Sequence, residues 1–291
     1  ETLPVGVSDD LGVLRQAILE FKPHVVFNLL EEFHEVETYD QHVVSYLELM
    51  KQHYTGCNPR GLMLAHDKAL SKKILNYHHI KTAQFAVFLK GRRIQKPARL
   101  KYPLFVKSLT EEGSFGLAQA SVVHNDAKLE ERVRYMHELG THVLAEEYIR
   151  GRELYAPILG HRRLEVLPIV ELAFKNLPDG IEPIATQRVK WDWGYQDKHG
   201  IQSEVDPDLP EETKERVRKL GKRVYKALGL SGYARIDMRL TEDDELYVLE
   251  ANPNPEMCSA AEAAGMSYEE FLARLLKLGL AYQAEWRRVG L

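Results

Sequence analysis

The sequence predicts a protein of the α/β and α+β classes, and two patterns carry that prediction. Apolar runs of strand length alternate with stretches whose apolar residues recur at helical spacing. Near the start, residues 25–30 form an apolar run after Pro23, which fits a parallel strand covered on both faces. Near the end, residues 234–249 alternate and turn as an antiparallel hairpin does. A mixed α/β lobe followed by α+β lobes is therefore expected.

The composition is that of an ordinary globular protein. The chain has 291 residues, of which 44% are hydrophobic and 28% are charged. This length suggests two domains or a few subdomains. The net charge of −4 gives no indication of a nucleic-acid surface, and no apolar run approaches transmembrane length. Cys57 and Cys258 are far apart and cannot support a disulfide framework, which fits a reducing cytoplasm.

The first lobe is expected to be α/β. Residues 2–7 suggest a strand, 11–21 a helix and 24–30 a buried strand. Apolar residues at helical spacing predict a helix over 40–52, and a turn follows at 54–59. A Rossmann-like half-domain normally has a strand and a helix before these elements, so we expect that a first unit is missing.

The remaining elements read as two α+β lobes. In the middle of the chain the patterns predict helices at 68–77 and 128–139, and strands at 84–88, 104–107 and 142–148. Further on they predict strands at 154–159, 164–171 and 183–190, a polar loop, a helix at 210–228, the hairpin, and a closing helix at 268–280.

The hairpin is the most informative segment for function. Arg235 and Asp237 lie two apart on its first strand, so their side chains leave the same face. Glu250 and Asn252 repeat that spacing at the end of the second strand, before Pro253. Two carboxylates and an amide are hard oxygen ligands of the kind Mg²⁺ prefers. A charged, solvated hairpin is the alternative interpretation.

A second motif combines a lysine with a glycine-bearing loop. Lys107 ends a predicted strand, and Gly113 and Gly116 lie in the loop that follows. Backbone N–H groups of such loops can surround phosphate oxygens. The loop is not a Walker A sequence, because no Gly-Lys-Ser/Thr follows. An ordinary turn with an exposed lysine is the alternative.

Together these motifs resemble those of the ATP-grasp superfamily, and most closely the D-alanine–D-alanine ligases. The resemblance rests on Arg235-Ile-Asp237 with Glu250-Ala-Asn252-Pro253, and runs from about residue 24 to about residue 274. It implies an ATP-grasp fold with a partial Rossmann-like N-terminal lobe. The implied domains are a partial pre-ATP-grasp lobe at 1–60, a central lid lobe at 61–149, and a C-terminal lobe with a metal site at 150–291.

The resemblance also implies roles for individual residues. The metal ligands would be Asp237, Glu250 and Asn252, and the catalytic residues Arg235, Lys190 and Ser114. Lysines would contact the phosphates, Glu146 the adenine amine, an N–H near Ile149 the purine ring, and Glu153 the ribose. The implied nucleotide-binding residues are Lys68, Lys107, Glu112, Gly113, Ser114, Phe115, Gly116, Glu146, Glu147, Tyr148, Ile149, Glu153, Lys190 and Leu249.

The function implied by the resemblance is an ATP-dependent carboxylate–amine ligase that acts through an acylphosphate. Its cofactors would be ATP and Mg²⁺, or Mn²⁺ in its place. We expect a small amino acid or peptide as substrate, no nucleic acid or membrane partner, a homodimeric assembly and a cytoplasmic location. Two alternatives stay open: an ATP-grasp ligase for other amino acids or peptides, and a non-catalytic nucleotide-binding regulator on the same fold.

One departure from the family bears on the second substrate. The D-alanine–D-alanine ligases carry a glycine where this chain has Glu256, and residues 28–32 replace their Leu-His-Gly stretch. A carboxylate at that position would repel the carboxylate of an incoming amino acid. We therefore expect D-alanine to be a poor acceptor.

Overall fold

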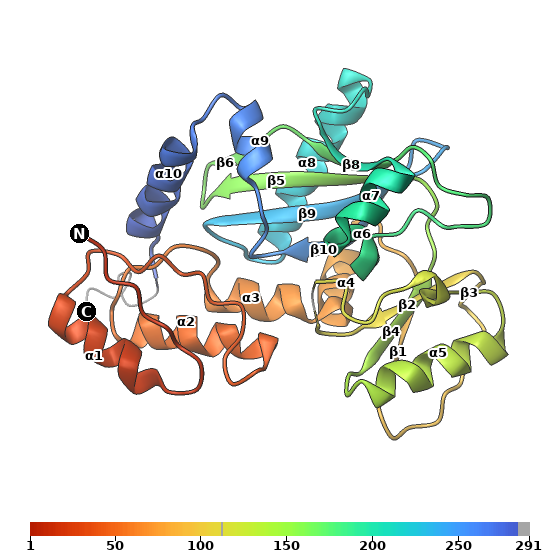
Figure 1. Ribbon diagram of the computed structural model, residues 1–291, viewed down its shortest axis with the longest axis horizontal. Helices are drawn as coiled ribbons and strands as arrows, with labels where there is room; N and C mark the ends of the chain where they lie inside the picture. Colours follow the sequence, from red (N-terminus) through yellow and green to blue (C-terminus); the bar gives the residue numbers. More distant parts are fainter. Residues whose placement is uncertain (112, 285–291) are drawn as a thin grey trace.

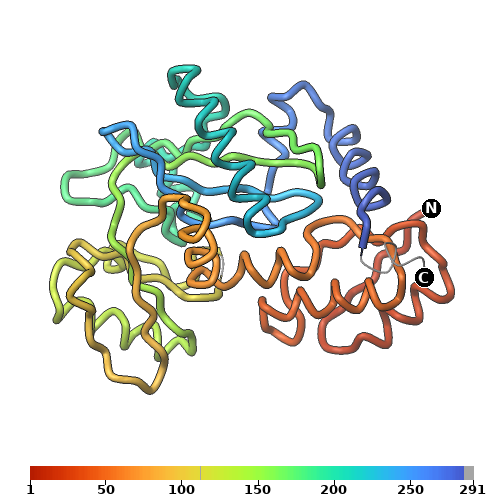
Figure 2. The backbone as a smooth tube through the Cα atoms, turned by 180° about the vertical axis from the view of Figure 1, so that it is seen from behind, coloured from red at the N-terminus to blue at the C-terminus, as the bar shows by residue number. Residues whose placement is uncertain are grey.

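Two antiparallel β-sheets, joined by helices, form the framework of the protein (Figure 1). The structure is a computed structural model that describes residues 1–111 and 113–284. An N-terminal helical part lies below the larger sheet in Figure 1, and a smaller sheet with its own helix lies beside it. The same arrangement is seen from behind in Figure 2, where α8 crosses the larger sheet.

The smaller sheet has four antiparallel strands in the order β1-β4-β2-β3. They are β1 (Phe85–Phe88), β2 (Leu104–Ser108), β3 (Val122–Val123) and β4 (Val143–Glu147). Helix α5 (Asp126–Glu138) covers one face and buries Leu129, Val133 and Met136 against the sheet. The opposite face is left to line a cavity.

The larger sheet runs β10-β9-β5-β7-β8, with β6 paired to β5. Its strands are β5 (Arg152–Gly160), β6 (Leu164–Val166), β7 (Val170–Phe174), β8 (Ile201–Val205), β9 (Tyr233–Leu240) and β10 (Leu246–Asn252). Because successive strand residues face opposite sides, Ile236 and Met238 pack under α8 (Glu211–Ala227). Tyr233 lies on the other face, with α9 (Cys258–Ala263) and α10 (Tyr268–Ala281).

The N-terminal part is helical. It contains α1 (Leu11–Phe21), the 3₁₀ turn η1 (Glu37–Tyr39), α2 (Asp40–Leu49) and α3 (Pro59–His66), and α4 (Lys68–Tyr77) continues towards the smaller sheet. Asp67 caps α4 by accepting a hydrogen bond from the Leu70 N–H at 2.8 Å. This cap begins α4 with Lys68 in its first turn.

Three expectations about elements are wrong. Residues 2–7 form no strand. Among the described residues, the run 25–30 makes one parallel bridge, between Val26 and Tyr54, and no strand. The third is 183–190, where α6 (Gln187–Trp191) forms instead of a strand, because the Thr186 hydroxyl accepts from the Val189 N–H and caps a helix. The expected polar loop after it holds α7 (Trp193–His199) and β8.

The other predicted elements form, with small shifts at their ends. The predicted helix over 11–21 and that over 68–77 agree with α1 and α4 residue for residue. The strand expected over 164–171 is divided into β6 and β7. Helices α3 and α9 and the short 3₁₀ turn η2 (Gln119–Ser121) were not expected.

At Gly232, just before β9, the larger sheet lies close to the backbone of Gly56 in the N-terminal part. The φ of Gly232 is +71°, and a Cβ added there would lie 2.2 Å from the Gly56 carbonyl oxygen. We predict that Gly232→Ala lowers the free energy of unfolding by about 2–4 kcal/mol, the sum of a left-handed backbone penalty and a steric clash. Urea unfolding measures this value.

Gly91→Ala is the matched control. Gly91 has a φ of +79°, but nothing lies within 4 Å of an added Cβ. Its replacement should cost only about 1 kcal/mol, the backbone penalty alone. Equal losses for the two variants would contradict the steric argument.

Candidate active site

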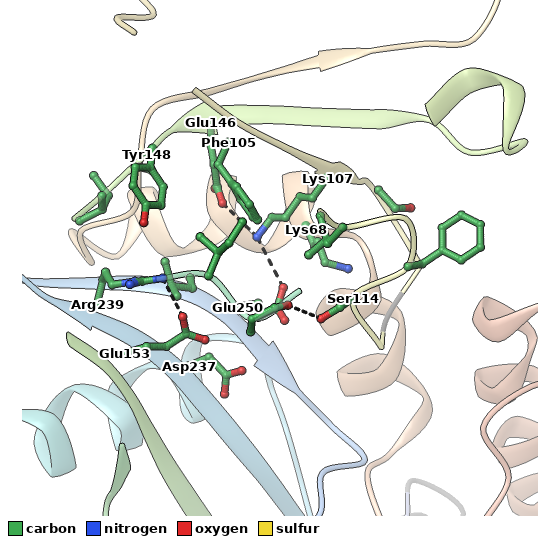
Figure 3. Close-up of a pocket in the computed structure, with 18 of the residues that line it drawn as sticks. Lys68, Phe105, Lys107, Ser114, Glu146, Tyr148, Glu153, Asp237, Arg239 and Glu250 are labelled. Atoms are coloured by element: carbon green, nitrogen blue, oxygen red, sulfur yellow. Dashed lines mark hydrogen bonds and ion pairs between the residues drawn. The ribbon is translucent and has the colours of Figure 1, made fainter. Parts of the chain in front are cut away.

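A cavity lies between the smaller sheet and the face of the larger sheet that does not carry α8 (Figure 3). Side chains from both sheets, from α4 and from the loop after β2 converge on it. The cavity is lined by Lys68, Ala83, Phe105, Lys107, Ser108, Glu111, Gly113, Ser114, Phe115, Leu117, Glu146, Glu147, Tyr148, Ile149, Glu153, Tyr155, Ile184, Ala185, Lys190, Asp237, Arg239, Leu249 and Glu250.

A buried network of charges forms one wall. Glu146 in β4 lies between two lysines: its Oε2 is 2.7 Å from Nζ of Lys72 in α4, and its Oε1 is 3.0 Å from Nζ of Lys107 in β2. Lys107 Nζ also lies 3.5 Å from Glu250 Oε2 in β10. Lys72 further donates to the Leu249 carbonyl at 3.2 Å. The network therefore joins both sheets.

The pKa directions follow from this arrangement. Burial acts to raise the pKa of Glu146, but Lys107 and Lys72 outweigh it and lower that pKa. Burial likewise opposes the charge of Glu250, yet Lys107, Lys68 and Lys190 lower its pKa. Burial lowers the pKa of Lys72, which Glu146 only partly offsets. Both carboxylates are therefore anions in a basic surrounding.

Across the floor of the cavity, Arg235 and Asp237 form a bidentate ion pair. Arg235 Nε is 2.7 Å from Asp237 Oδ1, and its Nη2 is 2.8 Å from Oδ2. Burial raises the pKa of Asp237, and Arg235 offsets part of that rise. In the hairpin register Asp237 is opposite Glu250, and Arg235 is opposite Asn252. The prediction that these four side chains share one surface is confirmed.

The far end of the floor is built around Glu153. Its Oε2 accepts from Arg239 Nη2 at 2.7 Å, and its Oε1 accepts from the Tyr155 hydroxyl at 2.9 Å. Nearby, the chain that joins β4 to β5 contains Ile149. Within 1–111 and 113–284, no backbone hydrogen bond is donated by the Ile149 N–H. This edge offers one carboxylate and one backbone donor.

The glycine-bearing loop lies over the cavity. Gly113, Ser114 and Gly116 all have positive φ angles, near +60°. The Ser114 hydroxyl donates to the Ala185 carbonyl at 2.6 Å, so it cannot at the same time donate to a phosphate. Lys68 Nζ donates to the Glu111 carbonyl at 2.9 Å. Glu112 lies outside the described residues.

Most of the predicted site residues line this cavity. The exceptions among the described residues are Gly116, Arg235 and Asn252. Gly116 packs instead against α5, where an added Cβ would lie 3.0 Å from Met136 Sδ. Arg235 and Asn252 lie beside the lining residue Asp237 through their ion pair and strand register.

Sequence reasoning missed Lys72, Tyr155 and Arg239. Each lies at helix or strand spacing from a predicted site residue, so this spacing could have identified it. Lys72 is four residues after Lys68 and shares its helix face, and Arg239 is two after Asp237 on the same strand face. Tyr155 bears the same relation to Glu153.

Comparison with known proteins shows which family this chain belongs to. Residues 74–277, more than half of the chain, match the family described as D-ala D-ala ligase C-terminus. A D-alanine–D-alanine ligase from Desulforudis audaxviator is 30% identical over 96% of this chain and 87% of its own. The chain belongs to the D-alanine–D-alanine ligase family. The expected fold, ATP-grasp, and the expected class of enzyme, an ATP-dependent carboxylate–amine ligase, are thereby confirmed.

Two further proteins are similar to this ligase. The protein y4sG of Sinorhizobium fredii, which is uncharacterized, is 30% identical over 87% of the ligase described here and 73% of its own length. The crystal structure of the Bacillus anthracis D-alanine–D-alanine ligase, complexed with ATP, superposes with a TM-score of 0.72. It shares 27% identity and covers 91% of this chain and 83% of its own. The non-catalytic alternative is not favoured.

The donor set of this ligase fits Mg²⁺ in its chemistry. Asp237, Glu250 and Asn252 supply carboxylate and amide oxygens, the ligands that a hard cation prefers. Over 1–111 and 113–284, no group of three or more His, Cys, Asp or Glu side chains could hold a metal. A cation held by Asp237, Glu250 and Asn252 would also take oxygens from substrate phosphates, as Mg²⁺ usually does. No helix within these ranges is long and apolar enough to cross a membrane.

The Lys72–Glu146 pair allows a test of the buried network. We predict that Lys72→Met lowers the free energy of unfolding by about 3 kcal/mol, because Glu146 keeps only one of its two buried partners. Urea unfolding followed by circular dichroism measures the loss.

Lys81→Met provides the control. Lys81 pairs with Glu245, but both side chains are about half exposed, at 57% and 47%. Removing such an exposed pair should cost much less than removing Lys72, because solvent screens the two charges. Similar losses in both variants would mean that the buried network contributes no more than a surface ion pair.

Proposed function

We propose that this ligase joins the carboxylate of one amino acid to the amine of a second amino acid or short peptide, at the expense of ATP. The carboxylate attacks the γ-phosphorus of ATP and gives an acylphosphate and ADP. The amine then attacks the acyl carbon, and phosphate leaves as the amide forms. The observation that carries the proposal is that Lys68, Lys107 and Lys190 line one cavity together with Asp237 and Glu250.

The proposed nucleotide site follows the length of the cavity. The Ile149 N–H is a donor for the purine ring, with Leu249 as an apolar floor beneath it. The Glu153 carboxylate accepts from the ribose hydroxyls, since each of its oxygens can take a second hydrogen bond. Glu146 already faces two lysines, so we propose that it orients Lys107 in addition to any contact with the purine amine.

At the proposed phosphate end of the cavity, positively charged groups must balance the negative charge of the phosphates. Lys68, Lys107 and Lys190 supply positive charge towards the phosphates, and the loop at Gly113–Gly116 supplies backbone N–H groups. Phe115 in that loop would exclude water from the acylphosphate. Mg²⁺, held by Asp237, Glu250 and Asn252, would neutralise the charge on the β- and γ-phosphates. Arg235 would stabilise the oxyanion that forms when the amine attacks.

Glu256 bears on the choice of acceptor. Its side chain is exposed, and its carboxylate accepts a hydrogen bond from the Cys258 N–H at the start of α9. The repulsion expected of Glu256 requires a carboxylate that faces the acceptor. Its use as a cap to α9 weakens that expectation, so we propose D-alanine as the first acceptor to test, with amidated amino acids beside it.

A substrate screen tests the proposed function. Phosphate release from ATP with Mg²⁺ is measured over D- and L-amino acids, their amides and short peptides, and products are identified by mass spectrometry. We expect one amino-acid pair to stimulate release and to yield an amide in equal amount. ATP binding without stimulation by any compound would favour a nucleotide-binding regulator instead.

Asp237 is the residue that most sharply tests the metal site. We predict that Asp237→Asn reduces Mg²⁺-dependent turnover by at least about a hundredfold, because one hard anionic ligand is lost. Mg²⁺ affinity in the presence of ADP, measured by calorimetry, should fall in parallel. Asp243→Asn, in the exposed turn of the same hairpin, should leave both values unchanged. Wild-type turnover in Asp237→Asn would exclude this carboxylate from the metal site.

A further inference from the structure

Tyr155 lies between the two polar ends of the cavity floor. Its hydroxyl donates to Glu153 Oε1 at 2.9 Å, and its ring faces the Arg235 guanidinium, whose Cζ lies 4.3 Å from the ring centre. Tyr155 is only 8% exposed to solvent. In the β5–β9 register Tyr155 is directly opposite Asp237. One side chain thus contacts the group proposed for ribose and the group proposed for the oxyanion.

Arg235 is held in two independent ways. The first is the bidentate ion pair with Asp237, which uses both carboxylate oxygens. The second is the cation–π stack on the Tyr155 ring, with Cζ 4.3 Å from the ring centre, which uses no carboxylate. Asp237 would share its oxygens between Arg235 and a divalent cation, whereas the contact with Tyr155 involves no carboxylate oxygen.

We infer that Tyr155 is a positioning residue for the ligase reaction: it keeps Arg235 in place when Asp237 turns to the metal. The inference rests on the proposed role of Arg235. The ring holds the guanidinium in place, and burial holds the ring, with the hydroxyl bond to Glu153 as a secondary contact. An arginine suits this arrangement better than a lysine, because its planar guanidinium can stack and still donate from its edge.

Two variants separate the ring from the hydroxyl. Tyr155→Phe keeps the stack and should retain kcat within about twofold, whereas Tyr155→Leu removes the stack and should lower kcat roughly tenfold. KM for ATP should be the same in the two variants, because both lose the hydroxyl bond to Glu153 and both keep the proposed phosphate contacts. The acceptor is the compound that gives the fastest phosphate release in the substrate screen. Equal kcat values for Leu and Phe would overturn the inference.

Tyr225→Phe controls for loss of a buried tyrosine hydroxyl. Tyr225 lies in the core under the larger sheet, and its hydroxyl donates to the Gly160 carbonyl at 2.8 Å. This variant should lose stability and keep its kcat. A kcat loss in Tyr225→Phe equal to that of Tyr155→Leu would mean that kcat follows stability alone, and would overturn the inference.

Two further measurements distinguish the inference from the proposed function and do not require Tyr155→Leu to fold. Arg235→Ala should lower kcat more than Tyr155→Leu does; full activity in Arg235→Ala would refute the proposed role of Arg235 itself. A crystal structure of the wild-type protein with Mg²⁺ and ADP should show Asp237 facing the metal and Arg235 still stacked on Tyr155. An Arg235 that has left the ring in that structure would overturn the inference while leaving the ligase function in place.

Discussion

The buried carboxylate of Glu146 is the constraint on which the active-site geometry depends. It is neutralised by one lysine from α4 and another from β2, and each of those lysines also contacts β10 of the larger sheet. Moving the larger sheet away would separate Lys107 from Glu250 and Lys72 from the Leu249 carbonyl, while Glu146 would keep both lysines. The two lysines therefore link the two sheets across the cavity at this point.

One face of the larger sheet packs in the hydrophobic core, and the other carries the polar side chains of the cavity. Along β9, Ile236 and Met238 pack under α8, while Arg235, Asp237 and Arg239 alternate with them and face the other side. Strand alternation alone produces this division, since successive side chains leave opposite faces. Substitutions on the cavity face can therefore change the chemistry with little effect on the packing beneath α8.

The sequence predicted well those features that local patterns determine. Helix α4 was predicted to the residue, because Asp67 caps it and its apolar positions recur at helical spacing. The hairpin and its four polar side chains were predicted because alternation fixes which residues share a face. The contacts of Glu146 could not be predicted, since they join residues from α4, β2 and β4 that only the tertiary fold brings together.

The errors have local causes as well. The apolar run at 25–30 resembles a strand, yet among the described residues only Val26 pairs with a neighbour, at Tyr54. A strand needs an adjacent strand for its hydrogen bonds, and periodicity does not supply one. At 183–190 the Thr186 hydroxyl caps a helix that begins at Gln187, where a strand was expected.

The loop over the cavity is attached to the larger lobe mostly by uncharged groups. Ser114 donates to the Ala185 carbonyl, and the Gln119 side chain exchanges two hydrogen bonds of 3.0 Å with the backbone of Glu182. Neutral hydrogen bonds are hardly screened by salt, unlike surface ion pairs. The rate at which this loop opens should therefore depend only weakly on ionic strength. Since the bonds at Glu182 and Ala185 use main-chain atoms, the attachment also tolerates replacement of those two side chains.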